Sequence, residues 1–358
     1  MKAWHSESQL HLEWPDGLAR DYHSLWLYDN QPGNRDPHSG QSLIDFTDLP
    51  ADAVIESSAC DRGYLTVHWR GGAVSQFELD WLRDPEARFA IRPRLWKTSD
   101  ASSLLWADYS NFDECGWLTA LAADGLAFMR NVESLEDVVR VVGYIRETNY
   151  GRVFDVKSRP DAENLAFTDL ALPVHTDNPY REPVPGLQIL HCVQPGSEGG
   201  DSILVDGFAV AEHLRTTDPY AFDLLSHTLV SFRYRSAADE FSAQRYMIEL
   251  SESHSVRAIH YNNRSIMTPV LPACESTAFY NASRTLSQLL KSPEFAYVVK
   301  LEKGDLLAFD NQRILHGRTA YRNTGQQRWL RGCYLDKADL ISRLAVRSRR
   351  REKCHSST

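Results

Sequence analysis

Two histidines and one carboxylate in this chain have the residue types and the spacing that suit a metal ion. His175 and Asp177 stand two apart, and His316 occurs much later, in the stretch Leu315-His316-Gly317-Arg318. Residues two apart on a strand project to the same face. Two imidazoles and one carboxylate on one face of an octahedron form the facial triad of non-haem Fe(II) oxygenases, which leaves three positions open. The sequence therefore predicts an iron site, although an H-x-D pair also occurs in many strands that bind no metal.

The charge balance of the chain argues against a nucleic-acid partner. The 358 residues include 39 lysines and arginines against 48 aspartates and glutamates, and the pI is about 5.8. Nucleic acids are bound through basic surfaces, and the single basic run, Arg347–Arg351, is typical of a solvated helix end. With 42% hydrophobic residues, the chain has the composition of a globular protein with a large core.

The cysteines and the N-terminus favour a cytoplasmic enzyme. The six cysteines are scattered and form no C-x-x-C pair, so we expect reduced thiols rather than disulfides or a zinc knuckle. Residues Met1–His5 carry no apolar signal core, and no run approaches the length of a membrane span. We therefore expect no association with a membrane.

Residues 1–95 have the pattern of a small β-rich N-terminal domain. Leu10–Trp14 alternates between apolar and polar residues, and Tyr64–Trp69 and Ser75–Leu79 flank a Gly71-Gly72 turn, as in a β-hairpin. A linker with Arg92-Pro93-Arg94 leads into the second domain, which we expect over residues 96–358.

Residues 96–358 combine short strands with flanking helices. Helices are predicted at Asn111–Ala123, Ser134–Thr148, Asp206–Leu214, Pro219–His227, Thr277–Lys291 and Asp336–Arg350. Strands are predicted at Gly186–Cys192, Ile203–Asp206, Leu229–Tyr234, Arg257–Tyr261, Ala296–Leu301, Leu306–Asp310 and Arg328–Leu335. Many short strands between turn signals favour a mainly β fold with flanking helices, of the double-stranded β-helix or jelly-roll type.

The blocks around the predicted ligands resemble the γ-butyrobetaine hydroxylase-like branch of the Fe(II)/2-oxoglutarate dioxygenases. The likeness covers nearly the whole chain and is carried by blocks in the family's order: His175–Asp177, Pro185–Cys192, Gly199–Ser202, Val205–Phe208, Phe309–Asn311, Leu315–Arg318 and Arg328–Tyr334. The resemblance implies a jelly-roll domain that holds Fe(II) through His175, Asp177 and His316. It also implies that 2-oxoglutarate and O2 are cosubstrates and that the protein is a homodimer.

The N-terminal domain departs from the family at a zinc site. Members of the family often hold a structural zinc ion through cysteines after an Asp-Asn pair and through a later histidine. Here the pair Asp29-Asn30 is followed by Gln31-Pro32-Gly33-Asn34, and the position of the histidine falls near Ala73. A closed zinc site needs four nitrogen or sulfur ligands, so we expect no zinc in this domain.

The resemblance assigns three residues to 2-oxoglutarate. Arg328, twelve residues after His316, matches the arginine that receives the far carboxylate, for which a guanidinium fork is well suited. Ser202 matches a hydroxyl that assists it, and Leu190 matches a further position beside the cosubstrate. The alternative to a cosubstrate role is that Arg328 is an ion-pair partner at the surface and that Ser202 is a turn residue.

The resemblance also implies a pocket for a small zwitterion. Four aromatic residues match an aromatic cage, which binds a trimethylammonium group by cation–π attraction: Tyr150, Phe154, Phe167 and Tyr334. Two asparagines, Asn164 and Asn262, match residues that donate hydrogen bonds to a carboxylate of the substrate. Asn178 and Arg181, just after the metal motif, offer further donors. Each of these residues has a plain structural alternative in the core, in a turn or at the surface.

Two substrates satisfy this pocket, and other functions stay open. The first substrate is 2-(trimethylammonio)ethylphosphonate, which would be hydroxylated to its 1-hydroxy product. The second is γ-butyrobetaine, which would be hydroxylated to carnitine. A taurine-type dioxygenase that acts on a non-quaternary sulfonate or an amino acid is the alternative among enzymes. A jelly-roll protein that binds metal without catalysis is the alternative from another class, because a fold alone does not determine function.

Overall fold

The computed structural model describes residues 1–85, 91–158, 168–196, 198–322 and 327–355, with side chains as far as residue 348. The chain divides into two compact units, Met1–Ala90 and Ile91–Thr358. This division lies five residues before the boundary at 95/96 that the sequence predicted. None of the described helices combines the length and the apolar character needed to cross a bilayer.

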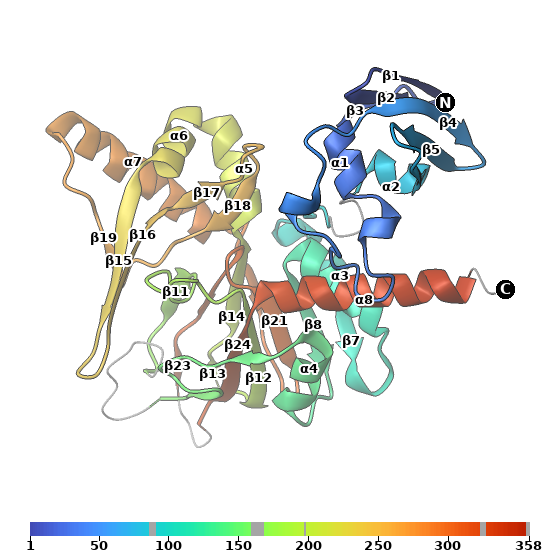
Figure 1. Ribbon diagram of the computed structural model, residues 1–358. Coiled ribbons are helices and arrows are strands. Elements are labelled where there is room, and N and C mark those ends of the chain that lie inside the picture. The colour runs from blue at the N-terminus through green and yellow to red at the C-terminus, as the bar shows by residue number, and fades with distance from the viewer. Residues whose placement is uncertain (86–90, 159–167, 197, 323–326, 356–358) are drawn as a thin grey trace. The chain divides into compact units, whose positions relative to one another are not determined.

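The described part of the first unit contains two three-stranded antiparallel sheets and two short α-helices (Figure 1). The sheets are β1-β2-β3, made of Lys2–His5, Gln9–Glu13 and Ala19–His23, and β4-β5-β6, made of Ile55–Asp61, Tyr64–Trp69 and Val74–Glu78. The helices are α1, Ser24–Asp29, and α2, Leu79–Arg83. Alternating apolar residues of both sheets form one core, which includes Leu10, Leu12, Leu65, Val67 and Trp69.

Hydrogen bonds secure the loop in which the sequence predicts no zinc. The Trp69 indole Nε1 donates to Ser75 Oγ at 2.7 Å, and the Ser75 hydroxyl donates to Gln31 Oε1. Asn34 Nδ2 donates to Tyr28 O at 2.7 Å. These contacts cross-link the loop to β5 and β6, and the lack of zinc stays a prediction.

The second unit contains one large sheet and several smaller ones among its described residues (Figure 1). The strand order of the large sheet is β10-β24-β12-β21-β8-β7, with β9 beside β24, and only β7 and β8 are parallel within the described residues. The strands are β7 Trp106–Asp108, β8 Leu126–Arg130, β9 Ile145–Arg146, β10 Phe154–Val156, β12 Leu187–Gln194, β21 Leu306–Asp310 and β24 Trp329–Leu335.

A smaller sheet packs on the large one. It has the order β11-β22-β14-β20, made of Leu172–His175, Ile314–Arg318, Ser202–Asp206 and Tyr297–Val299. Leu190 of β12 shares a buried cluster with Leu204 of β14 and Ile314 of β22, so side chains of the two sheets meet in one layer. Two sheets with interdigitating inner faces are the architecture predicted from the sequence.

The remaining strands form small sheets beside the smaller sheet. They are β13 Glu198–Gly199 with β23 Tyr321–Arg322, β15 Leu229–Arg235 between β16 Glu240–Tyr246 and β19 Ile266–Met267, and β17 Ile248–Leu250 with β18 Val256–Ile259.

Helices cover the outer faces of both main sheets. Alternation on β12 points Leu187 and Ile189 toward three helices. These helices are α3 (Glu114–Asp124), α4 (Leu135–Val142) and α8 (Lys337–His355). Figure 1 shows the other three helices grouped together, and they pack on the smaller sheet: α5 Gly207–Thr217, α6 Pro219–His227 and α7 Ala273–Lys291. Because both sheets are covered on both faces, their strands have long apolar runs.

One helix prediction is wrong in its second half. The apolar pattern predicted a helix over Ser134–Thr148, but α4 ends at Val142 and the chain continues into β9. There Ile145 and Arg146 pair with Leu335 and Tyr334 of β24. Sheet pairing with a strand far along the chain therefore overrides the local helical pattern. The prediction for α6 is confirmed: Asp218 accepts from Ala221 N, and Pro219 begins the helix.

A buried ion pair ties the start of the second unit to α3 and to the smaller sheet. The Arg313 side chain is 2% exposed, and its Nε and one terminal nitrogen donate to Asp206 at 3.0 and 2.8 Å. The same guanidinium donates to Ala123 O at 2.7 Å and to Arg94 O at 2.6 Å. Asp206 also accepts from Phe208 N, so it begins α5.

Replacing this arginine should destabilise the protein strongly. We expect Arg313→Met to lower the free energy of unfolding by about 3–5 kcal/mol, because it leaves a buried carboxylate without its partner. Arg331→Met is the matched control, since its pair with Glu136 is partly exposed, and we expect a loss of about 0–1 kcal/mol. Denaturant unfolding followed by tryptophan fluorescence measures both. Equal losses in the two variants would contradict the assignment.

Candidate metal centre and substrate cavity

Strand pairing brings the two histidines together. His175, at the end of β11, lies opposite His316 of β22 in antiparallel register, and their ring centroids are 4.5 Å apart. Residues directly opposite in an antiparallel pair project to the same face. A Cβ on Gly317 would lie 2.5 Å from Leu172 O, so a glycine at 317 lets β11 approach closely. The register of one strand pair thus places two of the three predicted ligands.

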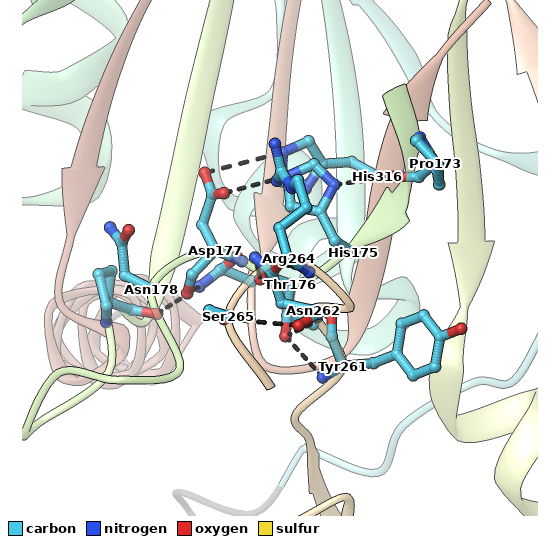
Figure 2. A network of polar contacts seen from close by, with 12 residues as sticks. Pro173, His175, Thr176, Asp177, Asn178, Tyr261, Asn262, Arg264, Ser265 and His316 are labelled. Atoms are coloured by element: carbon cyan, nitrogen blue, oxygen red, sulfur yellow. Dashed lines mark hydrogen bonds and ion pairs between the residues drawn. The ribbon is translucent and has the colours of Figure 1, made fainter. Parts of the chain in front are cut away.

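Asp177 reaches the histidines by a route that the sequence did not predict. We expected His175 and Asp177 on one strand, but β11 ends at His175, and Thr176 N then donates to Tyr261 O at 2.8 Å. The Asp177 carboxylate still returns to the site, with Oδ1 3.2 Å from His175 Nε2 and Oδ2 3.7 Å from His316 Nε2 (Figure 2). One ligand atom from each of the three residues lies within 4.8 Å of the others.

Asn311 holds the backbone of Asp177 in this position. Its Oδ1 accepts from Asp177 N at 2.7 Å, and its Nδ2 donates to Asp177 O at 3.0 Å and to Pro185 O at 3.1 Å. The Asn311 side chain is fully buried. Because Asp177 lies outside a strand, this side chain replaces the ladder bonds that a strand would have supplied.

The protonation of the three residues suits a divalent metal. His175 Nδ1 lies 2.9 Å from Pro173 O and must donate to it, which leaves the Nε2 lone pair for a metal. Burial, with His175 nearby, lowers the pKa of His316 to about 3, so this imidazole is neutral at pH 7. Burial alone would raise the pKa of Asp177, but His316, His175 and Tyr334 outweigh it and hold the pKa well below its usual value. Two imidazoles and one carboxylate fit Fe(II) with open positions.

A cavity of about 400 Å³ contains this cluster, together with the three residues assigned to 2-oxoglutarate. Arg328 is 5% exposed, and its Nε donates to Gly200 O at 2.9 Å. A Cβ on Gly200, whose φ is +75°, would lie 2.7 Å from Arg328 Cδ. Burial, and then Arg318, lower the pKa of Arg328 to about 10, so its guanidinium stays charged at neutral pH. No ion pair joins Arg328 to a carboxylate in the part of the chain that is described, whereas Ser202 and Leu190 line the same cavity.

Aromatic rings form another part of the cavity wall. Phe154 lies 6.2 Å from Tyr150 and 5.0 Å from Tyr334, measured between ring centroids. Two more tyrosines join them: Tyr180 stacks on Tyr234 at 5.2 Å, and Tyr234 lies 6.4 Å from Tyr150. All five rings line the cavity. Phe167, predicted as a fourth member of the cage, lies outside the described residues.

The predicted polar residues have different positions. Asn178 lines the cavity, with φ +54°; its Oδ1 accepts from the Tyr180 hydroxyl at 2.7 Å, and its Nδ2 has no partner among the described residues. Asn262 also lines it, but its Nδ2 donates to Thr176 O at 3.2 Å and its Oδ1 accepts from Arg264 N at 3.1 Å. At most one N–H of the Asn262 amide is therefore left for a ligand.

Arg181 is not brought to the cavity wall. Its guanidinium donates to Asn149 Oδ1 and lies 4.0 Å from the centroid of the Phe241 ring. The remaining predicted donor, Asn164, lies outside the described residues.

Sequence reasoning missed several residues of the wall. Tyr180 belongs to the metal motif, three residues after Asp177, so its place could have been noticed. Tyr234, Gln188 and Arg264 also line the cavity. Gln188 is 3% exposed and its Oε1 has no partner within the described residues. Tyr234 and Arg264 carry no spacing signal, because they reach the cavity from β15 and from the loop before β19.

Comparison with known proteins agrees with this geometry. The model of the family "Taurine catabolism dioxygenase TauD, TfdA family" matches residues 100–334. The chain belongs to this family. It is a 2-oxoglutarate-dependent non-haem iron dioxygenase, and its cofactor is Fe(II) with 2-oxoglutarate and O2 as cosubstrates. The family expected from the sequence is thereby confirmed, and so is the jelly-roll type of its catalytic fold.

Two relatives are similar to this chain in sequence, and one solved structure is similar to it in fold. The chain is 34% identical to a gamma-butyrobetaine dioxygenase of Pseudomonas sp. (strain AK-1), over 96% of this chain and 94% of that protein. It is 32% identical to a mitochondrial trimethyllysine dioxygenase of Rattus norvegicus, over 95% of this chain and 86% of that protein. The crystal structure of AAD-2 in complex with Mn(II) and N-oxalylglycine matches with a TM-score of 0.51 and 14% identity, over 69% of this chain and 96% of that one.

Loss of the carboxylate ligand should abolish the dioxygenase reaction. We expect Asp177→Ala to form no measurable succinate from 2-oxoglutarate and to bind Co(II) at least 100-fold more weakly, because one of three metal ligands is gone. Asp223→Ala, on the exposed face of α6, is the control and should match the wild type. Succinate release and anaerobic titration with Co(II) provide the measurements. Retained turnover in Asp177→Ala would refute the ligand assignment.

Loss of the asparagine that positions this ligand should weaken the metal site without removing a ligand. We expect Asn311→Ala to lower Co(II) affinity by about 10–100-fold and to reduce stability by about 1–3 kcal/mol, because buried backbone groups lose their partners. Asn281→Ala on α7 is an exposed control of the same type. Unchanged Co(II) affinity in Asn311→Ala would show that Asp177 finds its position without this side chain.

Proposed function

We propose that this dioxygenase hydroxylates a small zwitterion that carries a trimethylammonium group at one end and an anion at the other. The observation that carries the proposal is the wall of five aromatic rings, Tyr150, Phe154, Tyr180, Tyr234 and Tyr334, in the cavity that also holds the metal ligands. Rings attract a quaternary ammonium ion by cation–π forces of about 0.5–2 kcal/mol each.

The charges on the cavity wall favour a quaternary ammonium group over a primary amine. Within the described residues, the wall contains one carboxylate, Asp177, and that carboxylate belongs to the metal site. A primary ammonium group needs several hydrogen-bond acceptors or a carboxylate of its own. Aromatic faces offer neither, so such a group would have to leave the rings for an acceptor such as Gln188 Oε1. A trimethylammonium group donates no hydrogen bond, so rings alone suffice. This argument disfavours a taurine-type substrate with a free amine.

The anionic end of the substrate has polar partners on the same wall. Asn178 lines the cavity, and its Nδ2 has no partner among the described residues; its Oδ1 accepts from Tyr180, which fixes the orientation of the amide. Arg264, Asn262 and Ser265 line the cavity beside the metal motif (Figure 2). Arg328 and Ser202 are left for 2-oxoglutarate, so each anion has its own cationic group.

The chain's own residues then bind, orient and enclose the reactants. Bound at His175, Asp177 and His316, Fe(II) with 2-oxoglutarate and O2 supplies the chemistry that replaces a C–H hydrogen with a hydroxyl group. Anchors at both ends of the zwitterion fix which carbon faces the metal, and positioning of this kind accounts for much of the rate in such sites. The apolar wall excludes water from the reacting centre.

Two substrates remain, and a different observation favours each. The gamma-butyrobetaine dioxygenases among the relatives favour γ-butyrobetaine, with carnitine as the product. Arg264 on the cavity wall favours 2-(trimethylammonio)ethylphosphonate, because a guanidinium fork matches a phosphonate with its greater charge.

A substrate screen combined with one arginine variant tests the proposal. We expect succinate release and a product 16 mass units heavier with γ-butyrobetaine or with the phosphonate, and neither with taurine. If the phosphonate is the substrate, Arg264→Met should raise its KM by about 10–100-fold, the equivalent of about 1.5–3 kcal/mol for a charged hydrogen bond. Arg284→Met, exposed on α7, is the control. Turnover of taurine but of no trimethylammonium compound would refute the proposal.

A further inference from the structure

Tyr334 contacts the metal motif and the aromatic wall at the same time. Its hydroxyl donates to Asp177 Oδ2 at 2.7 Å, and its ring centroid lies 5.0 Å from that of Phe154. The residue is 3% exposed. In β24 it pairs with Gln188 on one side and with Arg146 on the other, so the sheet fixes its backbone from both sides. The ring is therefore a rigid link between two parts of the cavity.

The hydroxyl completes the environment of the ligand carboxylate. A carboxylate that gives one oxygen to a metal leaves the other oxygen in need of a donor, and such a donor orients the ligand. Among the described residues, the other side chains that bond to or pair with the Asp177 carboxylate are the two imidazoles. The hydroxyl of Tyr334 is thus the neutral donor that can hold the second oxygen when a metal takes the first.

The ring occupies the part of the wall where the trimethylammonium group is proposed to bind. A cation held against the ring face attracts π electrons and polarises the O–H bond, which strengthens the hydrogen bond from that hydroxyl. The same residue would thus respond to the substrate at its ring and act on the metal ligand at its oxygen.

We propose that Tyr334 is a positioning residue that couples occupation of the substrate cavity to the geometry of the metal site. The substrate part of this coupling depends on the function proposed above, whereas the effect of the hydroxyl on Asp177 does not. By reciprocity, a substrate that strengthens metal binding is itself bound more tightly when the metal is present.

Tyr334→Phe tests the hydroxyl and keeps the ring. Without substrate, we expect Tyr334→Phe to bind Co(II) about 10–100-fold more weakly than the wild type in anaerobic calorimetry. Tyr150→Phe is the matched comparison, because its hydroxyl lies 3.4 Å from the Tyr180 hydroxyl rather than on Asp177, and its Co(II) affinity should be unchanged. Wild-type Co(II) affinity in Tyr334→Phe would overturn the proposal.

Addition of γ-butyrobetaine or the phosphonate tests the coupling. We expect the trimethylammonium compound to increase the Co(II) affinity of the wild type. In Tyr334→Phe the compound still binds the retained ring, but we expect it to change the Co(II) affinity by less than about twofold. Tyr334→Ala should lose substrate binding as well. An undiminished coupling in Tyr334→Phe would contradict the proposal. If no trimethylammonium compound binds the wild type, the proposed function fails, and the measurement without substrate still decides the role of the hydroxyl.

A second variant covers the case in which Tyr334→Phe does not fold. Incorporation of 3-fluorotyrosine at position 334 keeps the ring and makes its hydroxyl a stronger donor, so we expect tighter Co(II) binding. An unchanged affinity would again contradict the role assigned to the hydroxyl.

Discussion

The antiparallel register between β11 and β22 is the constraint on which the site depends. It sets His175 opposite His316, and a slip of one residue between these strands would turn one imidazole to the outer face. Gly317 makes the pairing possible, because a side chain there would collide with the backbone of β11. β22 is also bound on its other edge by β14, so its position does not depend on β11 alone.

The third predicted ligand, Asp177, is positioned by a side chain and not by strand pairing. Asp177 lies beyond the end of its strand, in a segment whose backbone is held by one buried amide side chain, that of Asn311. Asn311 follows β21, which belongs to the large sheet, whereas β11 belongs to the small one. The predicted metal site is therefore assembled from both sheets. A displacement of one sheet against the other would separate Asp177 from the histidines.

The electrostatics of the cavity follow from the same arrangement. Among the described residues, one carboxylate and several arginines line the cavity, so this part of the wall carries excess positive charge before any metal is bound. Such a space favours anions, which suits 2-oxoglutarate and the anionic end of the proposed substrate. The positive end of that substrate can be accommodated only where the wall is uncharged, and the aromatic rings provide that region. Tyr334 contacts the aromatic region through its ring and the predicted metal site through its hydroxyl.

The sequence alone predicted the chemistry, because the ability of a side chain to bind a metal is a property of its residue type. His175, Asp177 and His316 could be named from their types and from the blocks around them, as could Arg328 and most helices and strands, whose patterns are local. Tertiary structure decided what depends on distant partners: the early end of α4, which pairing with β24 enforces, and the position of Asp177 outside a strand, which Asn311 allows. It also placed Tyr234, Gln188 and Arg264 on the cavity wall and kept Arg181 from it. Periodicity along the chain gives the direction of a side chain within its own element, but the folded packing of the elements decides which side chains meet.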